Sequence, residues 1–265
     1  MNPIFLFDLD QTLLNFHASE EKALEIISKK NGLAYTKDTY SHFKDYNKSL
    51  WLELEKGIIS RTDLFRLRFT DFIAQCKGES LGLDPLAINK EFIATMAENG
   101  VLMDGALEFV SKLKSTISGC RIYIISNGAT VNAKGRINST GLNAFLDGIF
   151  VSEEMGIAKP AKEFFDRVLS SIGAKKEECI VIGDSLTSDM AGAKNASIDS
   201  VWFMPQAGCN SSIENEMTQY DINYCANSFD ELYKILKNWA GQICNGRRQN
   251  RRLCKPELHH CDAHI

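Results

Sequence analysis

Near the start of the chain, Ile4-Phe5-Leu6-Phe7-Asp8-Leu9-Asp10-Gln11-Thr12 joins an unbroken apolar run to two carboxylates. Four successive apolar residues predict a strand that is buried on both faces, as in the middle of a parallel sheet. Ligands of open α/β sheets bind beyond the carboxyl ends of the strands. Asp8 and Asp10 follow such an end and are therefore candidates for chemistry.

Four later segments have the same short apolar pattern and predict further strands at residues 121–126, 148–152, 179–183 and 200–204. Amphipathic stretches of helical length, such as residues 131–140 and 163–172, separate them. This alternation predicts an α/β fold with a Rossmann-like, doubly wound and mostly parallel sheet.

The interval between the first and second predicted strands is far longer than a crossover connection needs. Helical periodicity runs through it at residues 19–31, 39–56, 62–77 and 85–99. An insertion of this size needs a core of its own. We therefore predict an α/β catalytic core at residues 1–15 and 100–240. An all-helical cap at residues 16–99 would close over the core during turnover.

Residues 241–265 differ in character from the rest of the chain, with an arginine-rich run followed by Cys254, His259, His260, Cys261 and His264. These side chains could form a zinc ligand set, but their spacing fits none of the usual structural zinc patterns. We therefore expect an irregular tail that is disordered or foreign to the natural chain.

The composition, with 44% hydrophobic and 24% charged residues, is typical of a globular protein. A net charge of −4 at pH 7 provides no broad cationic face, which argues against nucleic acid and anionic membranes as partners. No apolar run is long enough to span a membrane and no signal peptide pattern is present, so we expect a cytoplasmic protein. The eight cysteines lack the spacing of a disulfide framework, so we expect most of them to be reduced.

Carboxylates follow the first and fourth predicted strands and suggest phosphoryl transfer with Mg²⁺. Asp8 could attack phosphorus if a cation bridged the carboxylate and the phosphate, and Mg²⁺ binds the oxygens of both. Asp184 is then an expected metal ligand, and Asp10 is a candidate general acid and base. Asp189 would hold a metal-bound water or orient Lys159, unless it merely stabilises a helix N-terminus.

Ser126-Asn127-Gly128 follows the second predicted strand and offers a hydroxyl and backbone N–H groups to phosphate oxygens. The same residue types also suit a plain turn between a strand and a helix. Lys159 precedes Pro160, which favours an extended conformation at the lysine and is expected to start the next helix. Its ammonium could neutralise the phosphate and Asp8, although a lone lysine is most often a surface residue.

Taken in order, Asp8-x-Asp10-x-Thr12, Ser126-Asn127, Lys159 and Gly183-Asp184-(x)₄-Asp189 resemble the four motifs of the haloacid dehalogenase superfamily. The resemblance covers residues 1–240 and implies that the helical insertion is the cap of that family. It implies that Asp8 is the nucleophile and a Mg²⁺ ligand. It also implies further roles: acid/base and backbone metal ligand for Asp10, metal ligand for Asp184, phosphate binding for Ser126 and Lys159, and contacts with substrate or phosphate for Thr12, Asn127 and Gly128.

The family's dehalogenases lack an acid/base aspartate at the position of Asp10, so the resemblance favours phosphate esters as substrates. The motif residues, together with Arg136 and Ile198-Asp199-Ser200-Val201-Trp202, look most like bacterial pyrimidine 5′-nucleotidases. This likeness implies that the partner is a small phosphorylated metabolite, a nucleoside monophosphate. Ala161 departs from the pattern, because many relatives have an acidic residue there. We expect a monomer or a weak homodimer.

Other functions stay open, namely a phosphosugar or phosphoglycolate phosphatase, a phosphosugar mutase and a non-enzymatic regulatory or binding protein. Aromatic side chains in or beside the insertion could stack on a nucleobase, but most of them are needed to pack the helices. These side chains are Phe16, His17, Tyr46, Trp51, Phe65 and Phe69.

Overall fold

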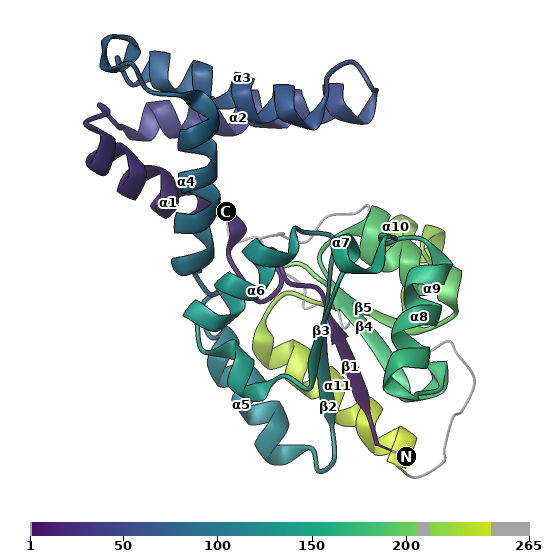
Figure 1. The fold of residues 1–265 in the computed structure, drawn as a ribbon. Helices are drawn as coiled ribbons and strands as arrows, with labels where there is room; N and C mark the ends of the chain where they lie inside the picture. The colour runs from purple at the N-terminus through teal and green to yellow at the C-terminus, as the bar shows by residue number, and fades with distance from the viewer. Residues whose placement is uncertain (1, 206–212, 245–265) are drawn as a thin grey trace, which may run out of the picture. The chain divides into compact units, whose positions relative to one another are not determined.

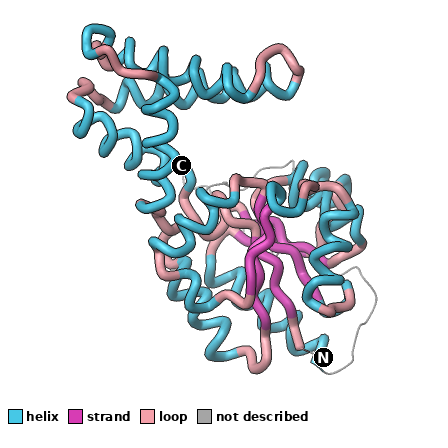
Figure 2. Tube along the Cα trace, in the orientation of Figure 1, coloured by secondary structure: helices cyan, strands magenta, loops and turns pink. Residues whose placement is uncertain are grey.

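The computed structural model describes residues 2–205 and 213–244 and divides into two compact units (Figure 1). Of the described residues, the α/β unit contains those up to residue 14, residues 102–130 and those from residue 142 onward. The helical unit contains residues 15–101 and 131–141, so it includes a segment that the predicted cap at residues 16–99 leaves out. The strands all belong to the α/β unit within the described residues (Figure 2).

The sheet of the α/β unit has six parallel strands in the order β3-β2-β1-β4-β5-β6. The strands are β1 (Ile4–Phe7), β2 (Arg121–Ser126), β3 (Gly148–Val151), β4 (Cys179–Gly183), β5 (Asp199–Phe203) and β6 (Tyr224–Ala226). This is a doubly wound order, and the predicted α/β class is confirmed. In the central strand, Phe7 pairs with Ile124 and Ile182, which brings the ends of β1, β2 and β4 level with one another.

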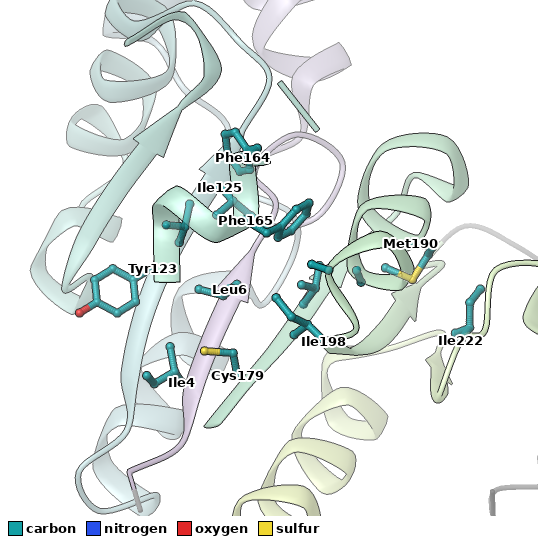
Figure 3. Packing of buried hydrophobic residues seen from close by; sticks show 14 residues of the cluster. Ile4, Leu6, Tyr123, Ile125, Phe164, Phe165, Cys179, Met190, Ile198 and Ile222 are labelled. Atoms are coloured by element: carbon teal, nitrogen blue, oxygen red, sulfur yellow. The ribbon is translucent and has the colours of Figure 1, made fainter. Parts of the chain in front are cut away.

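Side chains alternate between the two faces of the sheet, as strand geometry requires. Ile4 and Leu6 pack in a cluster with residues of α8 (Lys162–Ile172) and α9 (Ala191–Ala196) (Figure 3). On the opposite face, the ring of Phe7 lies 5.9 Å from that of Phe109 in α5 (Ala106–Thr116), and the ring of Phe5 lies 6.1 Å from that of Trp239 in α11 (Phe229–Cys244). Described helices therefore pack on both faces of the sheet, and the strand ends are the place where ligands of such folds bind.

Two predictions at the ends of elements are wrong. Pro160 does not start the next helix, because α8 begins at Lys162 and Pro160 lies in the turn before it. Helix α11 continues to Cys244, so the first four residues of the predicted irregular tail are helical. The rest of that tail, with its cysteines and histidines, lies outside the described residues.

The remaining elements of the α/β unit are α7 (Ser152–Met155), α10 (Ile213–Gln219), the 3₁₀ turns Leu142–Phe145 and Lys176–Glu178, and the π-helical turn η4 (Leu186–Met190).

The helical unit contains α1 (Phe16–Asn31), α2 (Lys37–Glu55), α3 (Arg61–Gln75), the 3₁₀ turn Glu79–Leu81 and α4 (Pro85–Glu98), and α6 (Thr130–Ser139) continues into it. Asn15 caps α1 by accepting a hydrogen bond from the backbone of Ala18, so this helix starts three residues earlier than predicted. Capping boxes at Thr36 and Ser60 start α2 and α3.

The core of the helical unit is rich in phenylalanine, and the rings of Phe43 and Phe72 lie 5.4 Å apart. Among the described helices, none combines the length and the apolar character that crossing a bilayer would require. Cys76, Cys120 and Cys179 are buried free thiols.

Candidate active site

Lys159 reaches the carboxyl ends of β1 and β4 and joins two carboxylates there. Its Nζ donates hydrogen bonds to Asp8 Oδ1 and to Asp189 Oδ1, both at 2.6 Å, and to the carbonyl oxygen of Ile125 at 2.9 Å. Lys159 is 4% exposed and Asp189 is fully buried. Three separate elements contribute to this cluster, because Asp8 follows β1, Asp189 lies in η4 and Lys159 lies in the loop before α8.

Asp184 extends the cluster toward a possible cation site. Asp8, Asp184 and Asp189 each offer a carboxylate oxygen within 4.8 Å of the others. Both oxygens of Asp189 already accept hydrogen bonds, Oδ1 from Lys159 and Oδ2 from the backbone N–H of Ser185 at 3.2 Å. Asp8 and Asp184 are therefore the better direct ligands. Carboxylate oxygens suit a hard divalent cation, so the donor set fits Mg²⁺.

The charge balance of the cluster also favours a bound cation. Burial and then the Asp189 carboxylate raise the pKa of Asp8 well above its ordinary value, while Lys159 opposes that shift. Burial and Asp189 raise the pKa of Asp184 to about 6. Burial alone would lower the pKa of Lys159, but Asp189 and Asp8 outweigh burial and raise it. Two carboxylates bind this ammonium and a third, Asp184, lies close to them. A divalent cation would relieve the repulsion among the three carboxylates.

The loop after Asp8 forms a tight turn. The backbone N–H groups of Leu13 and Leu14 both donate to the carbonyl of Leu9, and Gln11 adopts a φ of 59° in the left-handed region. Asp10 lies in this turn and is partly exposed, and its carboxylate is not a member of the three-carboxylate group. The turn fixes Asp10 two residues beyond Asp8, at the same edge of the sheet.

The residues predicted to hold phosphate lie at the end of β2 and in the turn that follows Asp8. Ser126 is buried, and its hydroxyl accepts a hydrogen bond from the backbone of Gly128 at 3.1 Å. The Asn127 side chain pairs with the backbone of Lys159 through two hydrogen bonds of 2.9 Å. Thr12 is fully buried, and its hydroxyl has no hydrogen-bond partner within the described part of the chain.

Three contacts of this site were not predicted from the sequence. The carbonyl of Ile125 accepts from Lys159, the indole N–H of Trp202 donates to the carbonyl of Asp184 at 2.9 Å, and Asn127 contacts the backbone of Lys159. Trp202 belongs to a stretch that resembles nucleotidases, but its residue type gives no signal for this hydrogen bond. Carbonyl contacts depend on strand register and loop path, which short motifs do not specify.

Comparison with known proteins identifies relatives over most of the chain. The family model for haloacid dehalogenase-like hydrolases matches residues 3–197. The pyrimidine 5′-nucleotidase PynA of Streptococcus pneumoniae is 33% identical over 232 residues, which cover 87% of this chain and 93% of that protein. The pyrimidine 5′-nucleotidase YjjG of Escherichia coli is 31% identical over 197 residues, which cover 74% and 83% of the two chains.

A similar solved structure is that of the HAD-hydrolase YfnB from Bacillus subtilis, which is described as bound to magnesium. It matches with a TM-score of 0.74 and 30% identity, and the match covers 89% of this chain and 98% of that one. The resemblance inferred from the motifs, including the likeness to pyrimidine 5′-nucleotidases, is confirmed by these matches.

Proposed function

Because the chain belongs to the haloacid dehalogenase-like hydrolase family, we propose that it hydrolyses small phosphate monoesters with the help of Mg²⁺. The observation that carries this proposal is the buried ion pair of Lys159 with Asp8 and Asp189 beside Asp184. These groups lie at the ends of β1 and β4, where the strand order of the sheet reverses and ligands of such folds bind.

In the proposed reaction, a carboxylate oxygen of Asp8 attacks phosphorus and the ester P–O bond breaks. Asp10 donates a proton to the leaving alkoxide, which departs as an alcohol. Asp10 then takes a proton from a water molecule, whose oxygen attacks the phosphorus of the aspartyl-phosphate. The P–O bond to Asp8 breaks, and inorganic phosphate leaves. Lys159 balances the negative charge of Asp8 and of the phosphoryl group throughout.

Mg²⁺ would be held by the carboxylates of Asp8 and Asp184 and by the backbone carbonyl of Asp10. When bound, it supplies positive charge that reduces the repulsion between a carboxylate and a phosphate dianion. Asp189 keeps Lys159 in place, since both of its oxygens are hydrogen-bonded. Ser126, Thr12 and the backbone N–H groups of Asn127 and Gly128 are proposed to bind the phosphate oxygens.

The proposed substrate is a nucleoside 5′-monophosphate, because two relatives that match most of this chain are named pyrimidine 5′-nucleotidases. The helical unit would act as the cap over the substrate. Of its aromatic side chains, Phe69 is fully buried in the helical core, while Trp51 is 37% exposed. Phe69 therefore packs the core, and Trp51 remains available to a ligand. A cytoplasmic location and a monomeric or weakly dimeric state remain predictions.

A phosphate-release screen tests this proposal. Pyrimidine and purine nucleoside monophosphates, phosphoglycolate and phosphosugars would be compared with Mg²⁺ and with a chelator. We expect pyrimidine nucleoside 5′-monophosphates to give the highest kcat/KM and the chelator to stop phosphate release. If a phosphosugar gave a positional isomer and no free phosphate, the protein would be a mutase and not a hydrolase. If one of these compounds bound and gave no product, the protein would be a regulatory protein and not an enzyme.

A further inference from the structure

Lys159 lies in a loop, although its ammonium is buried between two carboxylates of the site. The residue lies between α7 and α8, outside any helix or strand. A lysine side chain has four carbon–carbon torsions and reaches its partners only if its backbone is fixed. Asp8, Asp189 and the carbonyl of Ile125 hold its Nζ. Its backbone needs an anchor of its own.

Asn127 supplies that anchor with both ends of its side chain. Its Nδ2 donates to the carbonyl oxygen of Lys159 at 2.9 Å, and its Oδ1 accepts from the backbone N–H of Lys159 at 2.9 Å. The planar amide of asparagine carries a donor and an acceptor side by side, so it can bind the N–H and the C=O of one residue. The pairing reproduces the exchange of two hydrogen bonds between paired residues of antiparallel strands.

The location of Asn127 makes this contact part of the active site. Asn127 directly follows β2, whose Ile125 carbonyl binds the Lys159 ammonium and whose last residue is Ser126. Residues 125–127 thus hold both the backbone and the Nζ of Lys159. The segment also carries the Ser126 hydroxyl that is proposed to bind phosphate.

We propose that Asn127 is a positioning residue, whose side chain acts on catalysis through Lys159. This inference rests on the proposed function, in which the Lys159 ammonium balances the charge of Asp8 and the phosphoryl group. The backbone N–H of Asn127 remains available to phosphate, while the side chain amide serves the lysine. Without the Asn127 amide, the backbone of Lys159 loses two hydrogen bonds. The Lys159 ammonium then moves away from its position beside Asp8 and Asp189.

The first test measures the position of Lys159 without turnover. Asn127→Ala removes both hydrogen bonds. The matched control is Asn195→Ala, because the exposed Asn195 donates to the carbonyl of Pro160, the neighbouring residue of the same loop, at 3.0 Å. We expect the backbone amide of Lys159 to exchange its hydrogen faster in Asn127→Ala and at an unchanged rate in Asn195→Ala. An unchanged exchange rate in a folded Asn127→Ala variant would overturn the proposed anchor.

The second test asks whether Asn127 acts through Lys159. Asn127→Ala and Asn127→Asp should lower kcat/KM about 100-fold, the size of effect expected when a reacting group is displaced by about 1 Å. The affinity for inorganic phosphate in saturating Mg²⁺, measured by phosphorus NMR, provides a readout that needs no turnover. We expect Asn127→Ala to weaken phosphate binding in the wild-type background and to have no further effect in Lys159→Met.

This double-mutant cycle of Asn127→Ala and Lys159→Met distinguishes a failure of the positioning role from a failure of the proposed function. An equal loss of phosphate affinity in both backgrounds would mean that the Asn127 side chain binds phosphate itself, and the positioning role would be rejected. If Lys159→Met retained wild-type turnover and phosphate affinity, the role of Lys159 in the proposed function would fail instead.

Discussion

The α/β unit and the helical unit each bury a cation, but they surround it with different groups. In the α/β unit, Lys159 lies between the carboxylates of Asp8 and Asp189, with Asp184 close by. In the helical unit, Arg68 is 5% exposed and donates to the amide oxygen of Asn89 at 3.1 and 2.6 Å. The rings of Phe65, Phe69 and Phe92 lie 5.0 to 5.3 Å from its guanidinium carbon.

The difference lies in the balance of charge around the two cations. Arg68 meets neutral amides and aromatic faces, and among the described residues the only carboxyl group that acts on its pKa is that of the buried Glu20, so no excess of negative charge gathers there. Lys159 meets more carboxylates than it can neutralise. A buried cation in a polar network can serve structure alone, whereas an excess of buried negative charge at strand ends is suited to a metal and a phosphate.

The largest effect is expected from Asp8→Asn. The substitution keeps the shape of the side chain and removes the attacking charge, while Asp189 remains to pair with Lys159. We expect turnover to fall by about 10⁴-fold or more, as when a nucleophile is removed from a catalytic unit. Phosphate release and circular dichroism measured on the same sample check this expectation. Retained turnover would show that Asp8 is not the nucleophile.

A matched pair, Lys159→Met and Arg68→Met, tests the comparison between the two units directly. Lys159→Met should lower the free energy of unfolding by about 3–5 kcal/mol, because buried carboxylates are left without their partner. Arg68→Met should lower it by about 1–3 kcal/mol, because buried amide oxygens lose their donor. Turnover per folded molecule should fall about 100- to 1,000-fold in Lys159→Met, since a charge next to the reacting group is lost. It should change little in Arg68→Met. Equal losses of turnover would contradict the distinction drawn between the two cations.

The helical unit should also have its own dependence on pH. Burial raises the pKa of Glu20 from 4.5 to about 7, with Arg68 opposing the shift. The folded state therefore binds more protons than the unfolded state, and stability that is present below pH 4.5 is lost as the pH rises through about 7. The loss amounts to about 3 kcal/mol. Urea unfolding between pH 4 and 8 measures this loss, and the free energy of unfolding of Glu20→Gln should fall over that range by about 3 kcal/mol less than that of the wild type. An unchanged pH dependence would count against the burial of an ionisable Glu20.

The smallest effect is expected from Trp202→Phe. This substitution keeps an aromatic ring and removes the N–H group that donates to the carbonyl of Asp184. A single hydrogen bond contributes about 0.5–1.5 kcal/mol, so the affinity for Mg²⁺ should fall about 2- to 10-fold if the bond helps to place Asp184. Calorimetric titration of Mg²⁺ measures the change. The variant Trp239→Phe is a control, because Trp239 donates to Asp199 instead, and its Mg²⁺ affinity should match the wild type.

Much of the fold could be predicted because buried parallel strands are short apolar runs and packed helices are amphipathic. The three residues of β6 were not predicted, since so short a strand has no pattern of its own. The membership of residues 131–141 in the helical unit was not predicted either. It depends on close packing between helices, because a Cβ at Gly135 would lie 2.5 Å from the Cβ of Ala97. Such contacts between distant segments leave no periodic signal.

The candidate site could be predicted to the extent that it follows from strand ends. Parallel strands place their carboxyl ends at one edge, so Asp8 and Asp184 are neighbours once their strands are recognised. Lys159 was found by its place in the motif order, but its contact with Ile125 required coordinates. The same is true of Asn127, whose predicted role was phosphate binding and whose side chain contacts the backbone of Lys159.

In the proposed reaction, Asp8 carries the phosphoryl group during turnover. Enzyme quenched in denaturant during hydrolysis of a nucleoside monophosphate can be treated with borohydride, which reduces an acyl phosphate to an alcohol. Peptide mass spectrometry should then find homoserine at position 8 in place of aspartate, in amounts that depend on Mg²⁺ and are absent in Asp8→Asn. Homoserine in place of another aspartate, with position 8 unchanged while phosphate is being released, would show that Asp8 is not the carrier of the phosphoryl group.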